Sequence, residues 1–215
     1  MALSKVNFNS MNVTPSASKA IKFNSSNNGL ETGDIGGNLV LLATQTASSS
    51  ATLSFTSGID STYKEYIFKF INCHPANNDV NFQFNLSIDG GSNYNVTKTT
   101  TRFTALHSES DDNHQTLAYE ANRDMAQSTV DKILLNGVGN GSDESCSGVL
   151  HLFNPSSTTF VKHFIARAVE NRSDDTAEDA YGAGYANTTS AVNAIVFKFG
   201  SGNIDSGTIK MYGVL

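Results

Sequence analysis

Histidines and carboxylates are the side chains of this sequence best suited to chemistry, and the densest group lies between residues 107 and 114. His107 and His114 flank Glu109, Asp111 and Asp112. Imidazole and carboxylate groups ligate metals and act as acids and bases. Their spacing here follows no regular period that would bring them to one point. We therefore expect a polar, acidic loop rather than a metal centre.

A second pair of histidines lies on two expected strands that follow one another. His151 and His163 have apolar residues two positions before and after them, a pattern that favours partly buried side chains facing each other across a hairpin. Further on, Asp174 and Asp175 with Glu178 and Asp179 could attract a cation, although a solvated loop explains them equally well.

Sequence motifs of known catalytic machinery are missing: there is no G-x-S-x-G elbow, H-E-x-x-H helix or phosphate-binding loop. We therefore expect no catalytic residue, no bound metal and no cofactor. Two carboxylates at a suitable distance would suffice for a glycosidase, and an all-β fold could hold them, so a polysaccharide-degrading enzyme stays open as an alternative.

The stretch SIDGGSNY, residues 87–94, has three interpretations: an Asp box, a calcium loop or a turn. An Asp box is a folding hairpin that indicates a function only when it is repeated around a propeller, and this chain has one copy. A calcium loop needs more carboxylates than Asp89 alone. Gly90 and Gly91 supply the positive φ angles of a tight turn. We predict a turn, in a hairpin, with no metal.

Composition and charge exclude several classes of protein. The 215 residues carry 14 Lys and Arg against 20 Asp and Glu, a net charge of −6 that does not favour nucleic-acid binding. No apolar stretch is long enough to span a membrane. The two cysteines, Cys73 and Cys146, cannot form a disulfide framework and are expected to be buried as small apolar residues.

The chain changes character near residue 38. Residues 1–37 are rich in Ser, Asn and Gly, with isolated apolar residues that include Phe8, Met11, Ile21 and Phe23. Such a segment cannot bury enough surface to order itself alone. It is expected to be an extended N-terminal arm for assembly or attachment, and residues 38–215 are expected to form one domain.

The domain shows the patterns of β-strands. Residues 80–88 alternate apolar and polar side chains without an error, which predicts a half-buried antiparallel strand. Residues 66–73 favour a strand buried on both sides, with Tyr66, Phe68 and Phe70 on one face and Ile67, Ile71 and Cys73 on the other. Further strands are expected near 39–43, 51–56, 94–106, 146–153, 159–169, 193–199 and 207–214. Residues 154–158 are expected to be a hairpin loop, and residues 120–135 allow one short helix.

These patterns predict an all-β protein, an antiparallel β-sandwich of jelly-roll kind. Eight aromatic and aliphatic side chains are expected in its core: Phe68, Phe70, Phe82, Phe84, Leu86, Ile88, Phe197 and Phe199.

Several stretches carry a resemblance to known proteins. The run ATLSFTSGIDSTYKEYIFKFINCHPANNDVNFQFNLSIDGGSNYN, the run FNPSSTTFVKHFIA and the closing SGNIDSGTIKMYGVL resemble recurrent blocks in structural proteins of marine tailed bacteriophages. The segment KAIKFNSSNNGL resembles another such block. The likeness covers most of residues 38–215 and is weakest at 104–145 and 168–187.

The resemblance implies a non-enzymatic virion protein, assembled in the host cytoplasm: a tail-fibre or receptor-binding module. Its implied partners are other virion proteins, copies of itself in a homotrimer, and a host-surface glycan or protein. The alternative is a head-decoration or cement protein clamped to the capsid by its arm, and a third is a polysaccharide-degrading tail spike.

Surface recognition is expected in two long polar loops, residues 107–123 and 170–187, whose Tyr, Asn, Asp and His side chains can stack on and hydrogen-bond a sugar. The candidate recognition residues are His107, Asp111, Asp112, His114, Tyr119, Arg172, Asp174, Asp175, Tyr181 and Tyr185.

Overall fold

The chain forms two compact units, Met1–Asn38 and Leu39–Leu215. A computed structural model of the protein describes residues 13–14, 19–26, 28–34, 38–111 and 115–215. Phe8 and Met11 of the expected arm lie outside the described residues, as do Asp112 and His114 of the first expected recognition segment.

The first unit contains a β-hairpin. Strand β1 (Lys19–Phe23) pairs antiparallel with β2 (Leu30–Asp34), so that Phe23 lies opposite Leu30. The sequence analysis did not predict this local pairing. Ile21, Phe23 and Leu30 share one face of the hairpin and are exposed, Phe23 by 71%. Lys22 and Glu31 form an ion pair of 3.4 Å on the other face.

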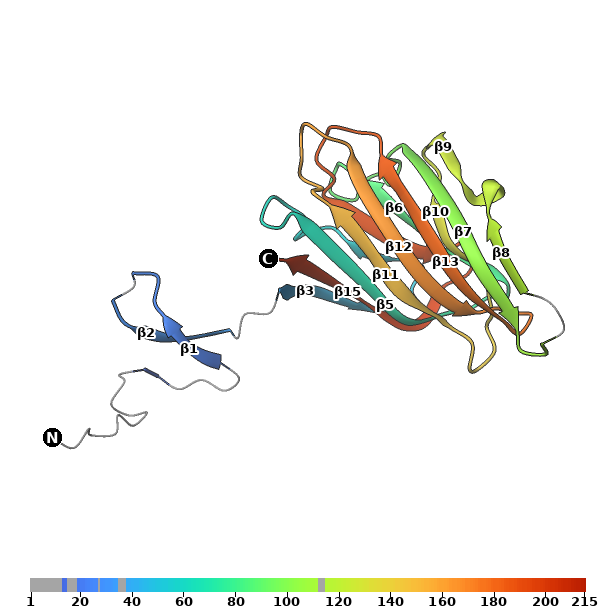
Figure 1. Cartoon of the computed structure of the whole chain (residues 1–215), viewed down its shortest axis with the longest axis horizontal. Helices are drawn as coiled ribbons and strands as arrows, with labels where there is room; N and C mark the ends of the chain where they lie inside the picture. The colour runs from blue at the N-terminus through green and yellow to red at the C-terminus, as the bar shows by residue number, and fades with distance from the viewer. Residues whose placement is uncertain (1–12, 15–18, 27, 35–37, 112–114) are drawn as a thin grey trace. The chain divides into compact units, whose positions relative to one another are not determined.

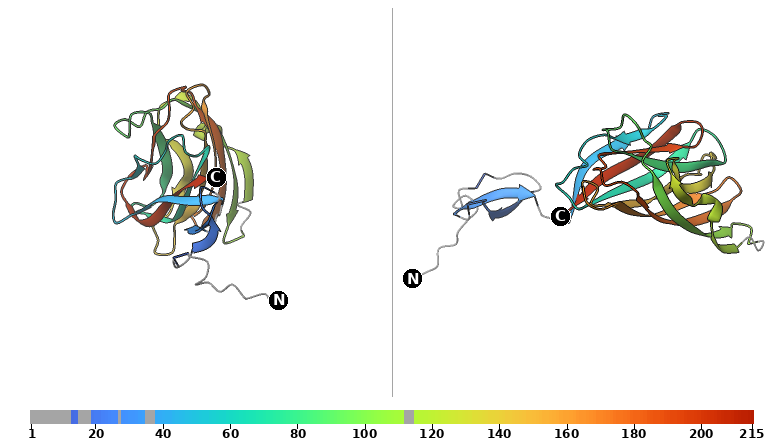
Figure 2. Two further views of the ribbon diagram at one scale, coloured as in Figure 1. Left: turned by 90° about the vertical axis from the view of Figure 1, so that its left-hand side faces the viewer. Right: turned by 90° about the horizontal axis from the view of Figure 1, so that it is seen from above.

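The second unit is a sandwich of two antiparallel sheets, which confirms the predicted fold class (Figures 1 and 2). The larger sheet has nine strands in the order β3-β15-β5-β11-β12-β13-β7-β8, with β9 also paired to β7. In chain order these strands are β3 (Leu39–Thr46), β5 (Glu65–Pro75), β7 (Lys98–Ser108), β8 (Gln115–Tyr119), β9 (Met125–Ser128), β11 (Cys146–Phe153), β12 (Lys162–Asn171), β13 (Thr176–Ala186) and β15 (Ile204–Val214).

The smaller sheet has the order β10-β6-β14-β4. Its strands are β4 (Leu53–Phe55), β6 (Val80–Ser87), β10 (Lys132–Val138) and β14 (Ala194–Phe199). In Figure 1, strands β11, β12, β13 and β7 lie in front, with β6 and β10 behind them. The jelly-roll connectivity stays a prediction.

Residues 120–135, whose pattern allowed one short helix, hold a single turn of 3-10 helix, η2 (Ala121–Arg123), followed by strands β9 and β10. Among the described residues, no helix is long and apolar enough to cross a membrane.

Aromatic side chains from both sheets form the centre of the core. Phe82, Phe84 and Phe197 of the smaller sheet contact Phe68, Phe70 and Phe164 of the larger one, with ring centroids 5.1–6.3 Å apart. Seven of the eight predicted core residues are buried. Ile88 is the exception, with 43% of its side chain exposed, because β6 ends at Ser87 and the chain turns away there.

A bulge in β5 overturns another prediction. The sequence analysis placed Ile71 and Cys73 on one face, opposite Phe70. Asn72 adopts a positive φ of 49°, and the pairing register with β11 shifts between Cys146 and Gly148. The extra residue turns Cys73 to the inner face, where it is buried opposite Cys146. Ile71 stays on the face opposite Phe70, but it is 43% exposed and not buried. Both cysteines are free thiols.

The polar face of β6 is covered rather than solvated. Asn85 is buried, and its Nδ2 donates to Asp131 Oδ1 at 2.9 Å. Gln83 donates to Asp131 Oδ2 at 3.2 Å, and Lys198 lies 2.8 Å from the same oxygen. The error-free alternation predicted the strand correctly, but the expected half-exposure was wrong because the segment before β10 packs on its polar side.

The stretch 87–94 is a turn, as predicted, but not a hairpin, because β6 and β7 belong to different sheets. Gly90 and Gly91 have φ angles of 73° and 91°. The Asp89 carboxylate accepts bonds from Ser87 Oγ at 2.6 Å and from Asn93 Nδ2 at 2.7 Å. The hydrogen bonds from Ser87 and Asn93 lower the pKa of Asp89 to about 2. Protein donors therefore occupy both oxygens of the carboxylate.

This turn yields a first prediction. A Cβ at Gly91 would lie 2.7 Å from Thr56 Cγ2 and 2.7 Å from Tyr94 Oη, whereas a Cβ at Gly90 would meet nothing within 4 Å. Gly90→Val should cost about 1–2 kcal/mol for its positive φ alone. Gly91→Val should cost about 1–3 kcal/mol more, from crowding. Thermal melts of the two variants, each with and without EDTA, test this. Equal losses, or a chelator effect on the unaltered protein, would contradict it.

Candidate functional site

The two expected recognition segments are mostly strands and not long loops. His107 lies near the end of β7, and its Nε2 is 3.5 Å from Asp111 Oδ1 in the turn that follows. Tyr119 lies on β8, where its hydroxyl bonds to Asp124. The second segment is the β12–β13 hairpin, in which Asp174 and Asp175 occupy the turn.

The structure separates these candidate residues into two groups. Tyr181 and Tyr185 on β13, together with Tyr119, belong to the outer face, defined here as the face of the nine-stranded sheet that points away from the smaller sheet. Arg172 instead directs its guanidinium inward, to the backbone oxygen of Asn136 at 2.7 Å. It also forms an ion pair with Asp174 at 3.2 Å.

The strand register aligns planar side chains in a row across the outer face. Arg167 on β12 lies opposite Tyr181, Tyr181 opposite Phe103 on β7, and Phe103 opposite Tyr119. The rings of Phe103 and Tyr181 stack at 4.7 Å with an angle of 4°, and the Arg167 guanidinium lies 4.9 Å from the centre of the Tyr181 ring. Both faces of the Tyr181 ring are thus covered by its neighbours.

Arg167 is fixed by Asp179 as well as by Tyr181. Its Nε and Nη2 donate to the two carboxylate oxygens of Asp179, at 3.1 Å and 2.7 Å, and the Tyr181 hydroxyl donates to Asp179 at 3.2 Å. The hydrogen bond from Arg167 lowers the pKa of Asp179. These contacts fix the orientation of the Arg167 and Tyr181 side chains on the outer face.

A parallel row of smaller side chains lies beside the first. His151 on β11 lies opposite Ile165, Ile165 opposite Ala183, and Ala183 opposite Thr101. Beyond it runs a third row, in which His163 lies opposite Tyr185 and Tyr185 opposite Thr99. The His163 and Tyr185 rings are 6.4 Å apart, edge to face.

These three rows form a trough across four strands, which we call the outer trough. Its floor is the row of His151, Ile165, Ala183 and Thr101, and the other two rows are its walls. Two adjoining cavities of about 380 and 430 Å³ occupy it and share Thr101, Ile165 and Ala183 in their lining, which is mostly apolar. No Asp or Glu is found among the described residues that line either cavity.

The sequence analysis identified only part of this site. It selected Tyr181 and Tyr185, but treated His151 and His163 as facing each other across a hairpin. In the structure both side chains point to the outer face, but His151 lies opposite Ile165, two positions away from His163. His151 Nδ1 lies 2.5 Å from Glu65 Oε1. It missed Phe103, Ile165 and Arg167. The signal available was the alternation of HFIARAV, which places Arg167 between two exposed apolar residues.

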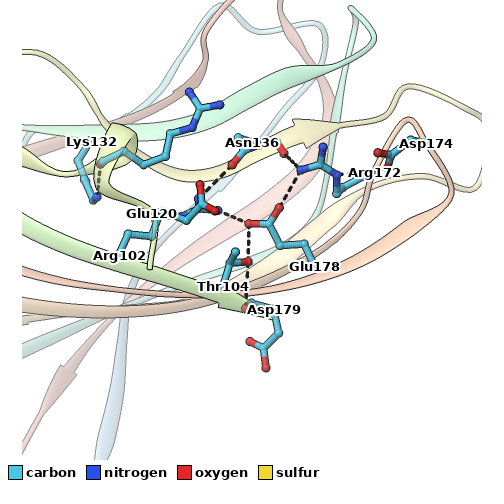
Figure 3. Close-up of polar contacts among 10 residues, drawn as sticks. Arg102, Thr104, Glu120, Lys132, Asn136, Arg172, Asp174, Glu178 and Asp179 are labelled. Carbon is cyan, nitrogen blue, oxygen red and sulfur yellow. Dashed lines mark hydrogen bonds and ion pairs between the residues drawn. The ribbon is translucent and has the colours of Figure 1, made fainter. Parts of the chain in front are cut away.

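On its inner side the larger sheet holds a cluster of ionisable residues in which Arg102, Glu170 and Glu178 are buried and Arg172 is 19% exposed. Figure 3 shows Arg102, Arg172 and Glu178 of this cluster. Glu178 accepts hydrogen bonds from Arg102, from Thr104 at 2.9 Å and from Arg172 at 3.0 Å. Arg102 also donates to Asn136 Oδ1 at 3.0 Å. All four side chains lie on the inner side of the larger sheet, away from the outer trough.

Burial shifts the titration of several groups in this region. Burial, and then the neighbouring Glu178, hold the pKa of Glu170 well above its usual value, so its protonated form is favoured. Burial also lowers the pKa of Lys132 to about 8, with Arg102 adding to the effect. Within the described part of the chain, no three His, Cys, Asp or Glu side chains are placed to hold a metal ion.

Small residues make room for these buried side chains. Ala166, Ala168, Ala180 and Gly182 point inward from β12 and β13, and β10 packs directly over them. A Cβ at Gly182 would lie 3.9 Å from the Lys132 side chain.

The fold and this site together define an antiparallel β-sandwich with an open, mostly apolar trough on the outer face of its larger sheet. Comparison of the chain with models of protein families, with curated proteins and with solved structures found no match.

Proposed function

We propose that the chain is a non-enzymatic bacteriophage virion protein, a tail-fibre or receptor-binding module that recognises the host surface through the outer trough. The resemblance of its sequence to structural proteins of marine tailed phages supports the virion role. The division into two units supports attachment through one and recognition through the other.

The observation that carries this proposal is the outer trough itself. Four rigid strands present three rows of side chains, among them a stacked Arg167–Tyr181–Phe103 row held by Asp179. The stacking and the bonds to Asp179 already order the side chains of this row, which lowers the entropy cost when a ligand binds. A preformed surface of this kind favours recognition of a partner.

The proposal predicts where the protein lies in a virion and what blocking it does. Antibodies raised against residues 39–215 should label tail fibres or the tail tip in immunogold electron microscopy. Their Fab fragments should lower the adsorption rate of particles that contain the protein by at least about ten-fold, with Fab fragments against the major capsid protein as the control. Gold confined to the head, with unchanged adsorption, would contradict the proposal.

A head-decoration or cement protein is the second candidate, and the β1–β2 hairpin favours it. The exposed face of Ile21, Phe23 and Leu30 is apolar, and an isolated two-stranded hairpin is marginally stable in water. Such a face gains stability by packing against another protein. Clamping to a capsid, or joining three copies in a fibre, would each bury it.

Both candidates make the same prediction for the first unit. Without residues 1–38, the sandwich should keep its melting temperature but should no longer form the oligomer, expected to be a trimer, or enter particles. Ile21→Ser with Phe23→Ser should have the same effect, whereas Lys22→Ser, on the other face, should not. Light scattering and a virion-incorporation assay measure both outcomes. Unchanged assembly of the truncated protein would exclude an assembly role for this unit.

A further inference from the structure

The dimensions of the outer trough limit what it can hold. Adjacent rows on one face of a strand are two residues apart, so the two walls stand about 13 Å apart from backbone to backbone. The side chains of the two walls occupy part of this distance. The remaining opening is about as wide as one sugar-sized ring, so it suits a single ligand chain. Across the strands the trough crosses four backbones, a length of about 14 Å.

The backbone beneath the trough offers a ligand no hydrogen bonds. Strand β13 is paired without a register shift to β12 on one side and to β7 on the other, so its N–H and C=O groups are used within the sheet. Extended peptides bind mainly through the free backbone groups of an edge strand. A ligand here must instead form its polar contacts with side chains, such as Thr99 and Tyr185 in one wall and His151 at one end of the floor.

Charge argues for a neutral ligand. Arg167 is the one Lys or Arg among the described residues that line the trough, and Asp179 already engages it through two hydrogen bonds. An anionic ligand would have to compete with that carboxylate. A cationic ligand would find no carboxylate in the lining.

The floor argues for apolar substituents on that ligand. Ile165 and Ala183 present only carbon to the trough, and Ile165 is 49% exposed. A hydroxyl pressed against them would lose its water without gaining a hydrogen bond, which is unfavourable, whereas a methyl group there removes apolar surface from water. Stacking of a sugar on Tyr181 is also blocked, because Phe103 and Arg167 cover both faces of its ring.

From these constraints, and resting on the proposed function, we propose that the outer trough binds a neutral glycan whose sugars carry methyl groups, either as N-acetyl substituents or as 6-deoxy positions. The methyl groups pack on Ile165 and Ala183, and the hydroxyls bond to side chains along the walls. The glycan chain lies across β11, β12, β13 and β7.

Two matched trisaccharides test the methyl requirement with the full-length protein. Triacetylchitotriose and cellotriose share a β-1,4-linked backbone and differ in the acetamido group, and a rhamnose trisaccharide supplies 6-deoxy methyls. By calorimetry, at least one methyl-bearing probe should bind about ten-fold or more tightly than cellotriose. In saturation-transfer NMR its methyl protons should receive the strongest transfer. Tighter binding of cellotriose or of a heparin oligosaccharide would overturn the inference.

Two leucine substitutions on the same strand locate the site. Ala183→Leu fills the trough floor, whereas Ala177→Leu lies on the outer face of β13 beyond the trough. The first should reduce affinity for the best probe by about ten-fold or more, and the second should leave it unchanged. Equal affinity in both variants would overturn the inference.

Two outcomes separate this inference from the proposed function. If no probe shows methyl-dependent binding but Fab fragments still block adsorption, this inference is wrong and the proposed function stands. If the protein binds the probe but is found only on phage heads, the proposed function is wrong and this inference stands.

Discussion

The Arg102→Met variant should unfold with a free energy about 3–5 kcal/mol lower than that of the unaltered protein. Arg102 is fully buried and contributes one of the two guanidinium groups that neutralise Glu178. Without it, Glu178 retains Arg172 and Thr104 but lies next to Glu170, its cross-strand neighbour. A buried carboxylate that loses a partner suffers most of its desolvation cost without compensation.

Arg167→Met is the matched control, because Arg167 also forms an arginine–carboxylate pair but on the outer face. Its side chain is 59% exposed, and the loss should stay below about 1 kcal/mol. Adding Glu178→Leu to Arg102→Met should recover part of the loss, because it removes the buried carboxylate that has lost one of its two arginine partners. Urea unfolding followed by circular dichroism suits this chain, which has no tryptophan. Equal losses of unfolding free energy in the two arginine variants would show that burial is not the reason why the Arg102–Glu178 pair stabilises the protein.

Phe84→Ala should cost about 3–5 kcal/mol, the usual range for emptying a buried aromatic site. Phe84 has no exposed surface and joins the two sheets, with its ring 5.2 Å from that of Phe164 and nearly perpendicular to it. Removing it leaves a cavity that rigid strands on both sides cannot close.

Ile88→Ala provides the comparison within the same segment. Although the sequence pattern groups Ile88 with Phe84, Ile88 is 43% exposed, and its loss should cost less than about 1.5 kcal/mol. Urea midpoints of the two variants would show the difference directly. A loss for Phe84→Ala below about 1 kcal/mol would mean that the two sheets do not pack through this residue.

Bulky alternating strands are where the sequence was most informative. The pattern of residues 80–88 located β6 and its inward face, because large apolar side chains repeat with the period of a strand. In a strand such as β6 the side chains alone identify the core. Strand β12 is different: every second residue from Lys162 to Glu170 is buried, but Ile165 and Val169 are exposed, so side-chain type points to the wrong face.

Strand β13 shows why part of the fold could not be predicted. Its inward residues are Thr176, Glu178, Ala180, Gly182 and Gly184, which lack the bulk of a core strand. They are small because β10 packs closely above them, and Glu178 is charged because Arg102 and Arg172 meet it there. The need for small residues and for one carboxylate is therefore set by partners that are distant in the chain. The local sequence pattern of β13 carries no information about them.

The outer trough was predictable only in its parts. Tyr181 and Tyr185 were selected as polar aromatic residues, but Phe103 and Ile165 carry no recognisable motif. They become part of one surface through the strand register, which pairs β7 with β13 and β13 with β12. The bulge at Asn72 is a similar case, because one inserted residue changes which side chains are exposed.

The position of β15 in the larger sheet determines when this protein can fold. Strand β15 lies between β3 and β5, and Thr208 pairs with Thr46, which is 162 positions earlier in the chain. During synthesis, the edges of β3 and β5 have no partner until β15 has left the ribosome. Folding with pairings this distant is slow, on the order of milliseconds to seconds for all-β domains. The sandwich therefore forms after translation of its last strand, and a chain arrested before Ile204 exposes two unpaired strand edges to aggregation.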